Sequence, residues 1–210
     1  MNKKERINKK LIVSPHIDDD VLGCGGIIDE NSVVLYCGAN ESEIPDRPSS
    51  EIRLKEAQKV SAFLGNEFIL LDNKVNNYAL VTLISQIEKH INQIQPEEIY
   101  LPHPSYNQDH RTVHAASITA LRPHDKNYFV KKVMIYEQPH VFLWDHAAKN
   151  FIPNYFAEID VDKKIQAYQL MQSQVRSFRG SDMIRSLAQL RGSQSNFKFA
   201  EAFQILRWIQ

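Results

Sequence analysis

The chain has 210 residues, and its 25 Lys and Arg side chains balance 25 Asp and Glu side chains, so the formal net charge is zero. With 43% hydrophobic and 24% charged residues, the composition is that of a soluble globular protein and excludes a disordered one. The neutral balance gives no reason to expect nucleic acid as a partner. Two cysteines make no disulfide framework, and no apolar run is long enough for a membrane span, so we expect a cytoplasmic protein.

Short apolar runs and helical patterns alternate from the start of the chain. Residues 11–14, 33–37 and 68–71 predict buried strands, because each run is apolar and stops at Pro, Gly or Asp. The charged segment 49–64 has apolar residues at helical spacing and is followed by Gly65, which predicts a helix that ends there.

The same alternation continues to residue 136. Apolar residues at helical spacing predict a helix at 81–94, ended by Pro96, and a strand at 99–101, a helix at 111–121 and a strand at 130–136 follow. Strands alternating with helices indicate βαβ units. We therefore predict an α/β fold, a Rossmann-like three-layer sandwich with a mostly parallel sheet.

The last third of the chain has a different pattern. Residues 155–161 alternate as an edge strand does, and 162–174 and 183–190 predict helices. The sequence has no Pro/Gly/Ser-rich linker and no repeat, so one domain is the economical interpretation.

The first polar cluster directly follows the first strand. Asp18, Asp19 and Asp20 are adjacent carboxylates that repel one another, and they need a cation or backbone donors nearby. His16 adds a nitrogen ligand, and His with Asp is half of a zinc site. The alternative is a solvated acidic loop whose Asp side chains cap a helix that starts near Val21.

The second polar cluster, residues 107–111, follows the strand at 99–101. Ligands of open parallel sheets lie beyond the carboxyl ends of the strands, so we expect the two clusters to meet in space. His110, at the start of a helix, is a better ligand than His114, for which a packing role is the alternative. His16, Asp19 and His110 would supply three ligands and leave the open fourth position of a catalytic zinc.

The two clusters resemble the HPDDE and HPDHR signatures of the LmbE-like, or PIG-L, zinc deacetylase family. The similarity extends to Arg191-Gly192 and to residues 200–203, so it covers nearly the whole chain. It implies a single LmbE-like deacetylase domain over residues 1–210. The implied activity is zinc-dependent N-deacetylation, an amide hydrolysis that removes the N-acetyl group from an N-acetylglucosamine-type sugar conjugate.

The resemblance also implies the roles of individual residues. His16, Asp19 and His110 would bind Zn2+, and Asp18 would be the general base on a zinc-bound water. The expected partner is an N-acetylated amino-sugar substrate, and a homo-oligomer is possible. A magnesium phosphatase of the haloacid dehalogenase kind is an alternative for the Asp-x-Asp, but it leaves the two histidines unexplained.

One position departs from the family pattern. Asn107 stands where the family commonly has a His, and an asparagine donates a hydrogen bond to an oxyanion but delivers no proton at neutral pH. Either Asp18 returns the proton, or His103 moves in, or the protein is a metal-retaining sugar-binding or weakly active family member. Asp109, which the family uses to orient its His, is expected to hold Asn107 or another His.

Further residues are candidates for contact with the substrate. The guanidinium of Arg53 suits sugar hydroxyls or a phosphate, with a surface ion pair to Glu51 or Glu56 as the alternative. Glu137 and His103 lie at strand ends. The resemblance also implies that Ser173, Gln174 and Arg191 line the sugar pocket, with helix packing as the alternative. An aromatic cluster is either core or a sugar-stacking rim, and it comprises Tyr136, Phe142, Trp144, Phe151, Tyr155 and Phe156.

Overall fold

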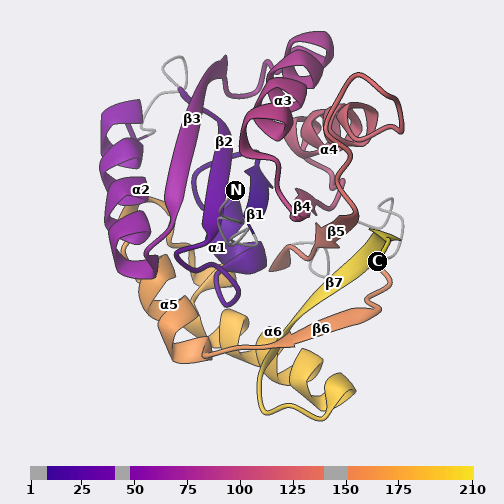
Figure 1. The fold of residues 1–210 in the computed structure, drawn as a ribbon. Coiled ribbons are helices and arrows are strands. Elements are labelled where there is room, and N and C mark those ends of the chain that lie inside the picture. Colours follow the sequence, from indigo (N-terminus) through magenta and orange to yellow (C-terminus); the bar gives the residue numbers. More distant parts are fainter. Residues whose placement is uncertain (1–8, 41–47, 140–150) are drawn as a thin grey trace, which may run out of the picture.

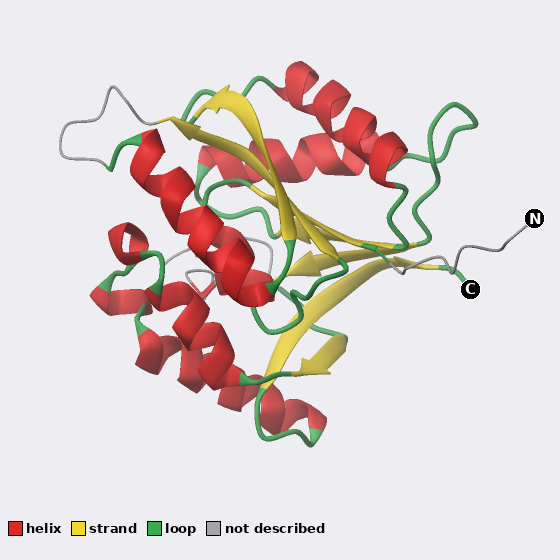
Figure 2. Cartoon of the chain, turned by 60° about the vertical axis from the view of Figure 1, so that its left-hand side comes forward, coloured by secondary structure: helices red, strands yellow, loops and turns green. Residues whose placement is uncertain are grey.

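The computed structural model describes residues 9–40, 48–139 and 151–210 and shows a twisted sheet with helices on both of its faces (Figures 1 and 2). Within these ranges, seven strands form one sheet in the order β3-β2-β1-β4-β5-β7-β6. β1 to β5 pair in parallel, whereas β7 is antiparallel to both β5 and β6. The predicted α/β fold with a mostly parallel sheet is confirmed.

The parallel part of the chain alternates strands and helices as predicted. Its elements are, in chain order, β1 (Lys10–Ser14), α1 (Asp19–Cys24), β2 (Ser32–Asn40), α2 (Ser50–Leu64), β3 (Glu67–Lys74), α3 (Leu80–Ile94), β4 (Glu98–Pro102), α4 (Gln108–Ala120) and β5 (Lys132–Tyr136). The remaining elements are β6 (Tyr155–Glu158), α5 (Val161–Gln169), the 3-10 turns η2 (Gln172–Gln174) and η3 (Ser177–Arg179), α6 (Ser181–Ser195) and β7 (Ala200–Trp208).

The two faces of the sheet carry separate hydrophobic clusters, because successive side chains of a strand point to opposite faces. Leu11 and Val13 of β1 pack in the cluster that α3 and α4 cover, whereas Ile12 packs in the cluster that α1, α2, α5 and α6 cover. Figure 1 shows these helix layers on either side of the sheet. Burial on both faces explains why the strands are continuous apolar runs in the sequence.

Local signals set the ends of several helices. The Ser49 side chain accepts a hydrogen bond from the backbone N–H of Ile52 at the start of α2. Gly65 ends α2 in the left-handed conformation, with φ of 89°, which glycine adopts without a steric penalty. The predicted helix at 49–64 is therefore found almost residue for residue.

Three elements in the last third differ from the prediction. The helix expected over 162–174 ends at Gln169, and the chain then makes the turns η2 and η3. β7 was not predicted as a strand, because what places it is pairing with the distant β5, in which Trp208 lies opposite Lys132. The expected edge strand at 155–161 is present as β6 but ends at Glu158, since Asp160 caps α5 by accepting from the backbone N–H groups of Asp162 and Lys163.

The order of the strands positions the site. The chain runs outward from β1 through β2 to β3 and then returns to β4 on the other side of β1. The loops that leave β1 and β4 therefore diverge from neighbouring strand ends, which is where open α/β sheets hold their ligands. These two loops carry the two polar clusters found in the sequence.

Candidate metal centre

The loop after β1 is held by hydrogen bonds within its own residues. The Ser14 hydroxyl donates to the His16 carbonyl at 2.7 Å and accepts from the Asp20 N–H at 3.1 Å. Asp18, the residue before α1, has φ of 155° and ψ of −24°, a backbone conformation that costs energy for any residue with a side chain. Strained backbone of this kind clusters at functional sites, and here it occurs at a residue of the first polar cluster.

The loop after β4 presents the second cluster from the start of a helix. Asn107 is the N-cap of α4, and its side-chain oxygen accepts from the Asp109 N–H at 2.8 Å. Asp109 and His110 lie in the first turn of α4 and are buried. The cap sets where α4 begins, and His110 lies in that first turn.

The two loops meet as predicted and bring together three side chains that could hold a metal ion. Asp19 Oδ2 lies 3.2 Å from His16 Nδ1 and 3.2 Å from His110 Nε2, and all three ligand atoms are within 4.8 Å of one another. Ligand atoms around a tetrahedral zinc with bonds of about 2.0–2.1 Å are about 3.3 Å apart. The two separations of 3.2 Å and the donor set, two imidazole nitrogens and one carboxylate oxygen, therefore fit a zinc ion.

Hydrogen bonds orient the ligands. His16 turns its Nε2 to Asp109 Oδ2 at 2.9 Å, which leaves Nδ1 for Asp19. Asp109 Oδ2 also accepts the backbone N–H of Asn76 at 2.7 Å. A carboxylate behind a ligating histidine is a common outer layer of metal sites. Of the two alternatives for Asp109, its carboxylate contacts another His rather than the Asn107 side chain.

The charges in the cluster shift one another's pKa values. Burial acts against protonation of His16, but its hydrogen bonds to Asp109 and Asp19 outweigh burial and raise its pKa to about 10. Burial alone would raise the pKa of Asp19, yet the charge of His110 and the bonds to both imidazoles hold it well below its ordinary range. The two imidazoles thus keep the carboxylate of Asp19 charged.

Asp18 lies next to the cluster but has a different partner. Its Oδ2 accepts a hydrogen bond at 2.7 Å from Nη2 of Arg179. Burial raises the pKa of Asp18 even though the positive charge of Arg179 opposes that shift. The residue is a buried carboxylate next to the expected metal position, as a general base requires.

A cavity of about 350 Å³ opens over these residues. Its walls combine the cluster with side chains from α2, from the loop after β3 and from the segment around η2 and η3. Arg53 and Asn107, both proposed from the sequence, line it, and so does Gln174. Sequence reasoning missed other lining residues: Val75, Asn76, Tyr106, Arg176, Phe178 and Arg179.

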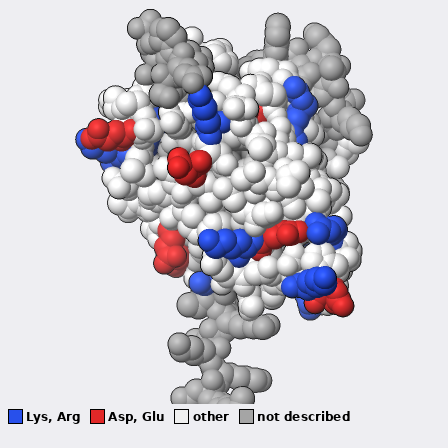
Figure 3. Space-filling model, turned by 90° about the horizontal axis from the view of Figure 1, so that it is seen from above, with Lys and Arg blue, Asp and Glu red and all other residues white. Residues whose placement is uncertain are grey.

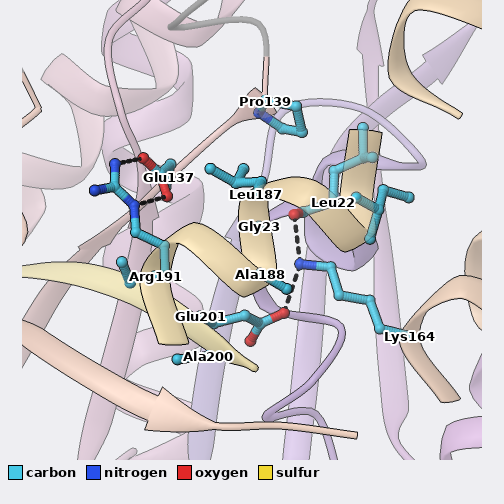
Figure 4. Close-up of a pocket in the computed structure, with 12 residues that line it drawn as sticks. Leu22, Gly23, Glu137, Pro139, Lys164, Leu187, Ala188, Arg191, Ala200 and Glu201 are labelled. Atoms are coloured by element: carbon cyan, nitrogen blue, oxygen red, sulfur yellow. Dashed lines mark hydrogen bonds and ion pairs between the residues drawn. The ribbon is translucent and has the colours of Figure 1, made fainter. Parts of the chain in front are cut away.

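Two other sequence candidates lie in a separate, smaller pocket. Glu137 forms a buried two-bond ion pair with the guanidinium of Arg191, and both residues line a space of about 20 Å³ between α1, α6 and β7 (Figure 4). Lys164 and Glu201 form a second ion pair across the same pocket, with the Lys164 ammonium pointing at the Glu201 carboxylate. Glu137 and Arg191 are absent from the lining of the larger cavity.

The other candidates do not line the larger cavity and contact neighbouring side chains or backbone instead. His103 is buried edge-on against Phe151, with ring centroids 5.7 Å apart, and His114 directs Nδ1 to the Pro102 carbonyl oxygen at 2.9 Å. The side chain of Ser173 bonds to Glu56, so Ser173 ties η2 to α2. In the aromatic cluster, Tyr136 is buried in the core. Phe142 and Trp144 lie outside the described residues.

The surface agrees with the neutral composition. The face in Figure 3 shows acidic and basic side chains interspersed on a largely uncharged surface. Among the helices of the described ranges, none is both long enough and apolar enough to cross a bilayer.

Comparisons with known proteins point to one family. A family model described as PIG-L, GlcNAc-PI de-N-acetylase, matches residues 11–121, which include both polar clusters. No curated protein matches the chain.

Several solved structures share the fold. The N,N'-diacetylchitobiose deacetylase from Pyrococcus horikoshii is 20% identical with a TM-score of 0.77, and the match covers 95% of this chain and 84% of that one. A conserved protein from Thermus thermophilus is also 20% identical, with a TM-score of 0.79 over 96% of both chains. The 4-carboxy-2-hydroxymuconate hydratase from Pseudomonas putida is 21% identical, with a TM-score of 0.74 over 96% of this chain and 98% of that one. At such identities the likeness is one of fold.

Proposed function

Because the chain belongs to the PIG-L family, described as GlcNAc-PI de-N-acetylases, we propose that it is a zinc-dependent hydrolase of N-acetylglucosamine-type sugar conjugates. It would remove the N-acetyl group, and residues 1–210 would act as one LmbE-like deacetylase domain. The observation that carries the proposal is the group of His16, Asp19 and His110 with the buried carboxylate of Asp18 beside it. All four residues line one open cavity.

The three ligands leave one side of the metal position facing the cavity. A zinc ion held there would supply a water of lowered pKa and would polarise the amide carbonyl of the substrate. Asp109 keeps the imidazole of His16 in place through its 2.9 Å hydrogen bond. These residues bind and orient, and the proton transfers fall to Asp18.

Asp18 would act twice in the hydrolysis. It first accepts the proton of the attacking water, and a new C–O bond to the acetyl carbon forms as the carbonyl becomes an oxyanion. Asp18 then returns the proton to the departing nitrogen as the C–N bond breaks, which yields acetate and the free amine. Asn107 has its oxygen engaged in capping α4 and can offer only its NH2 group to the oxyanion.

Arg53 would contact the sugar or its carrier, because it is buried in the wall of the cavity. A guanidinium suits hydroxyl groups or a phosphate there. Glu137 and His103 stay candidates from the sequence that the lining of this cavity does not support.

A second candidate function rests on Asn107. A neutral amide at this position donates a hydrogen bond but no proton, which favours a family member that keeps its metal and binds sugars with weak or no turnover. The hydratase of the same fold also shows that this architecture is not limited to deacetylation.

The test begins with the purified protein and its metal content. About one zinc per chain is expected by elemental analysis, with acetate release from one of a panel comprising N-acetylglucosamine, its β1,4-linked dimer, a nucleotide conjugate and a glycolipid. A chelator should abolish the release, and added zinc should restore it. Zinc-loaded protein that binds one of these sugars but releases no acetate from any would support the second candidate instead.

A further inference from the structure

We propose that Arg179 is a catalytic residue of the deacetylation, whose positive charge stabilises the oxyanion formed from the acetyl carbonyl. This inference rests on the function proposed above. It assigns a role to a residue of η3, a turn that comes after α5 and η2 and lies far in sequence from both polar clusters.

The first observation is the position of Arg179. Its Nη2 donates to Asp18 Oδ2 at 2.7 Å and to the Gln174 carbonyl oxygen at 3.3 Å, and the residue lines the cavity over the metal ligands. A group that touches the general base and faces the same cavity lies next to the place where the attacked carbonyl must sit.

The second observation is the burial of Arg179. Its side chain is 15% exposed, and its Nε–H is buried without a hydrogen-bond partner among the residues that the structure describes. Because water screens a mostly buried guanidinium only weakly, its charge acts strongly on groups in the cavity.

The third observation concerns Asn107 and Arg176, two other polar groups that line the cavity. Asn107 offers a neutral amide whose orientation is fixed by the cap of α4. Arg176 directs its Nη1 to the carbonyl oxygens of Ser173 and Val175, both at 2.9 Å. Arg179 thus combines a full charge with direct contact to Asp18, as oxyanion stabilisation needs.

The step balances without any further reactant. As the water oxygen bonds to the acetyl carbon, its proton goes to Asp18 and the π electrons of the carbonyl go to the carbonyl oxygen. Arg179, now facing a neutral acid, shares its charge with that oxygen. When the C–N bond breaks, the oxygen regains its double bond, Asp18 gives the proton to nitrogen, and Arg179 pairs with the carboxylate again.

The experiment compares an anionic tetrahedral analogue with the neutral amide, using zinc-loaded protein and calorimetry. The analogue is the N-methylphosphonamidate of glucosamine, which carries a P–O⁻ group, and the amide is N-acetylglucosamine. We expect Arg179→Met to weaken analogue binding about 100-fold and to change binding of the amide less than about threefold. Arg179→Lys should recover part of the loss. Arg185→Met, which removes an arginine paired with Asp162 at the surface, is the control and should change neither.

A second pair of variants separates direct action from positioning of Asp18. In an Asp18→Asn background, Arg179→Met should still weaken analogue binding by a similar factor, because the charge acts on the ligand itself. Equal weakening of both ligands, or no effect in that background, would overturn the assignment. Wild-type protein that neither releases acetate nor prefers the analogue would instead defeat the proposed function, and the role of Arg179 with it.

Discussion

Two clusters of buried charge lie at α1, and they differ in how their charges are paired. The first, the ligand cluster, comprises His16, Asp18, Asp19 and His110 under a cavity of about 350 Å³. The second, the paired cluster, comprises Glu137 with Arg191 and Lys164 with Glu201 around a space of about 20 Å³, which is room for about one water.

The paired cluster balances its charges internally, because two cations face two carboxylates. Lys164 Nζ donates to Glu201 Oε1 at 2.6 Å and to the Leu22 carbonyl oxygen at 2.8 Å, and the same Glu201 oxygen accepts the Gly26 N–H at 2.8 Å. These bonds tie α5 and β7 to α1. The ligand cluster instead carries a strained Asp18 and an open side. Buried charges that pair with one another around a small space indicate a structural role. A strained carboxylate beside an open cavity indicates a chemical role.

The largest expected effect is on turnover, from the ligand cluster. Asp18→Asn should lower kcat for acetate release by about 100-fold to 10,000-fold, since the amide cannot take the proton of the water. The zinc content should change little, because the substitution leaves His16, Asp19 and His110 unaltered and asparagine has nearly the same shape as aspartate. Asp182→Asn, at an exposed position of α6, is the control. Retention of more than a tenth of the activity would sink the assignment of the base.

The next effect is on stability, from the paired cluster. Lys164→Met leaves the buried carboxylate of Glu201 without its cation and should lower the free energy of unfolding by about 3–5 kcal/mol in urea titrations. Lys163→Met alters the exposed neighbour on the same helix and should cost less than about 0.5 kcal/mol.

The double variant Lys164→Met, Glu201→Leu sharpens the same comparison. It removes both charges and should recover part of the loss, because a buried pair can be replaced by apolar groups at little cost. If it were less stable than Lys164→Met alone, the penalty would come from packing and not from an uncompensated charge.

The two clusters also differ in how far the sequence predicted them. His16, Asp19 and His110 lie within a few residues of strand ends, and strand ends can be recognised from apolar runs. The topology rule for parallel sheets then brings the two loops together. Sequence alone therefore predicted the three-layer fold, which is confirmed, and the three residues that the structure groups.

The paired cluster and Arg179 could not be predicted in this way. Glu137 directly follows β5, and Lys164, Arg191 and Glu201 come from α5, α6 and β7, so no common spacing links the four residues and tertiary packing alone brings them together. β7 was missed for the same reason, because its pairing partners are distant in sequence. Arg179 follows a helix that ends early, in a stretch without periodicity, so no local pattern points to the site.

A smaller effect on stability is expected from a substitution in α1, the helix that contributes Asp19 to the ligand cluster and Leu22 to the pocket of the paired cluster. A Cβ at Gly23 would lie 2.2 Å from Cδ2 of Tyr136, a buried ring whose hydroxyl is bonded to the Val13 carbonyl oxygen. Gly23→Ala should therefore cost about 1–3 kcal/mol of unfolding free energy through overpacking. Gly180→Ala, where the nearest atom is 3.5 Å away, should cost less than about 1 kcal/mol, because the methyl group has room and only the N-cap of α6 is weakened. Equal costs for both would mean that Tyr136 moves aside freely and that α1 is not held by this contact.

The smallest effect concerns an ion pair outside both clusters. Lys10 Nζ and Asp29 Oδ2 are 2.7 Å apart, but the two side chains are 22% and 36% exposed. Asp29→Asn should cost about 0–1 kcal/mol at about pH 7, since water already screens the pair. This is several-fold less than the cost expected for Lys164→Met.

The pH dependence of that cost tests the same explanation. Partial burial opposes ionisation of Asp29, but the bonds from Lys10 and Ser32 outweigh it and lower its pKa below the ordinary 3.8. A carboxyl group with a lowered pKa binds fewer protons in the folded state, so its stabilisation is present above 3.8 and is lost as the pH falls through the folded value. The stability difference between wild type and Asp29→Asn should therefore shrink in urea titrations carried down to about pH 2.5. If Asp29→Asn cost as much at neutral pH as Lys164→Met, burial would not explain the larger contribution of the paired cluster to stability.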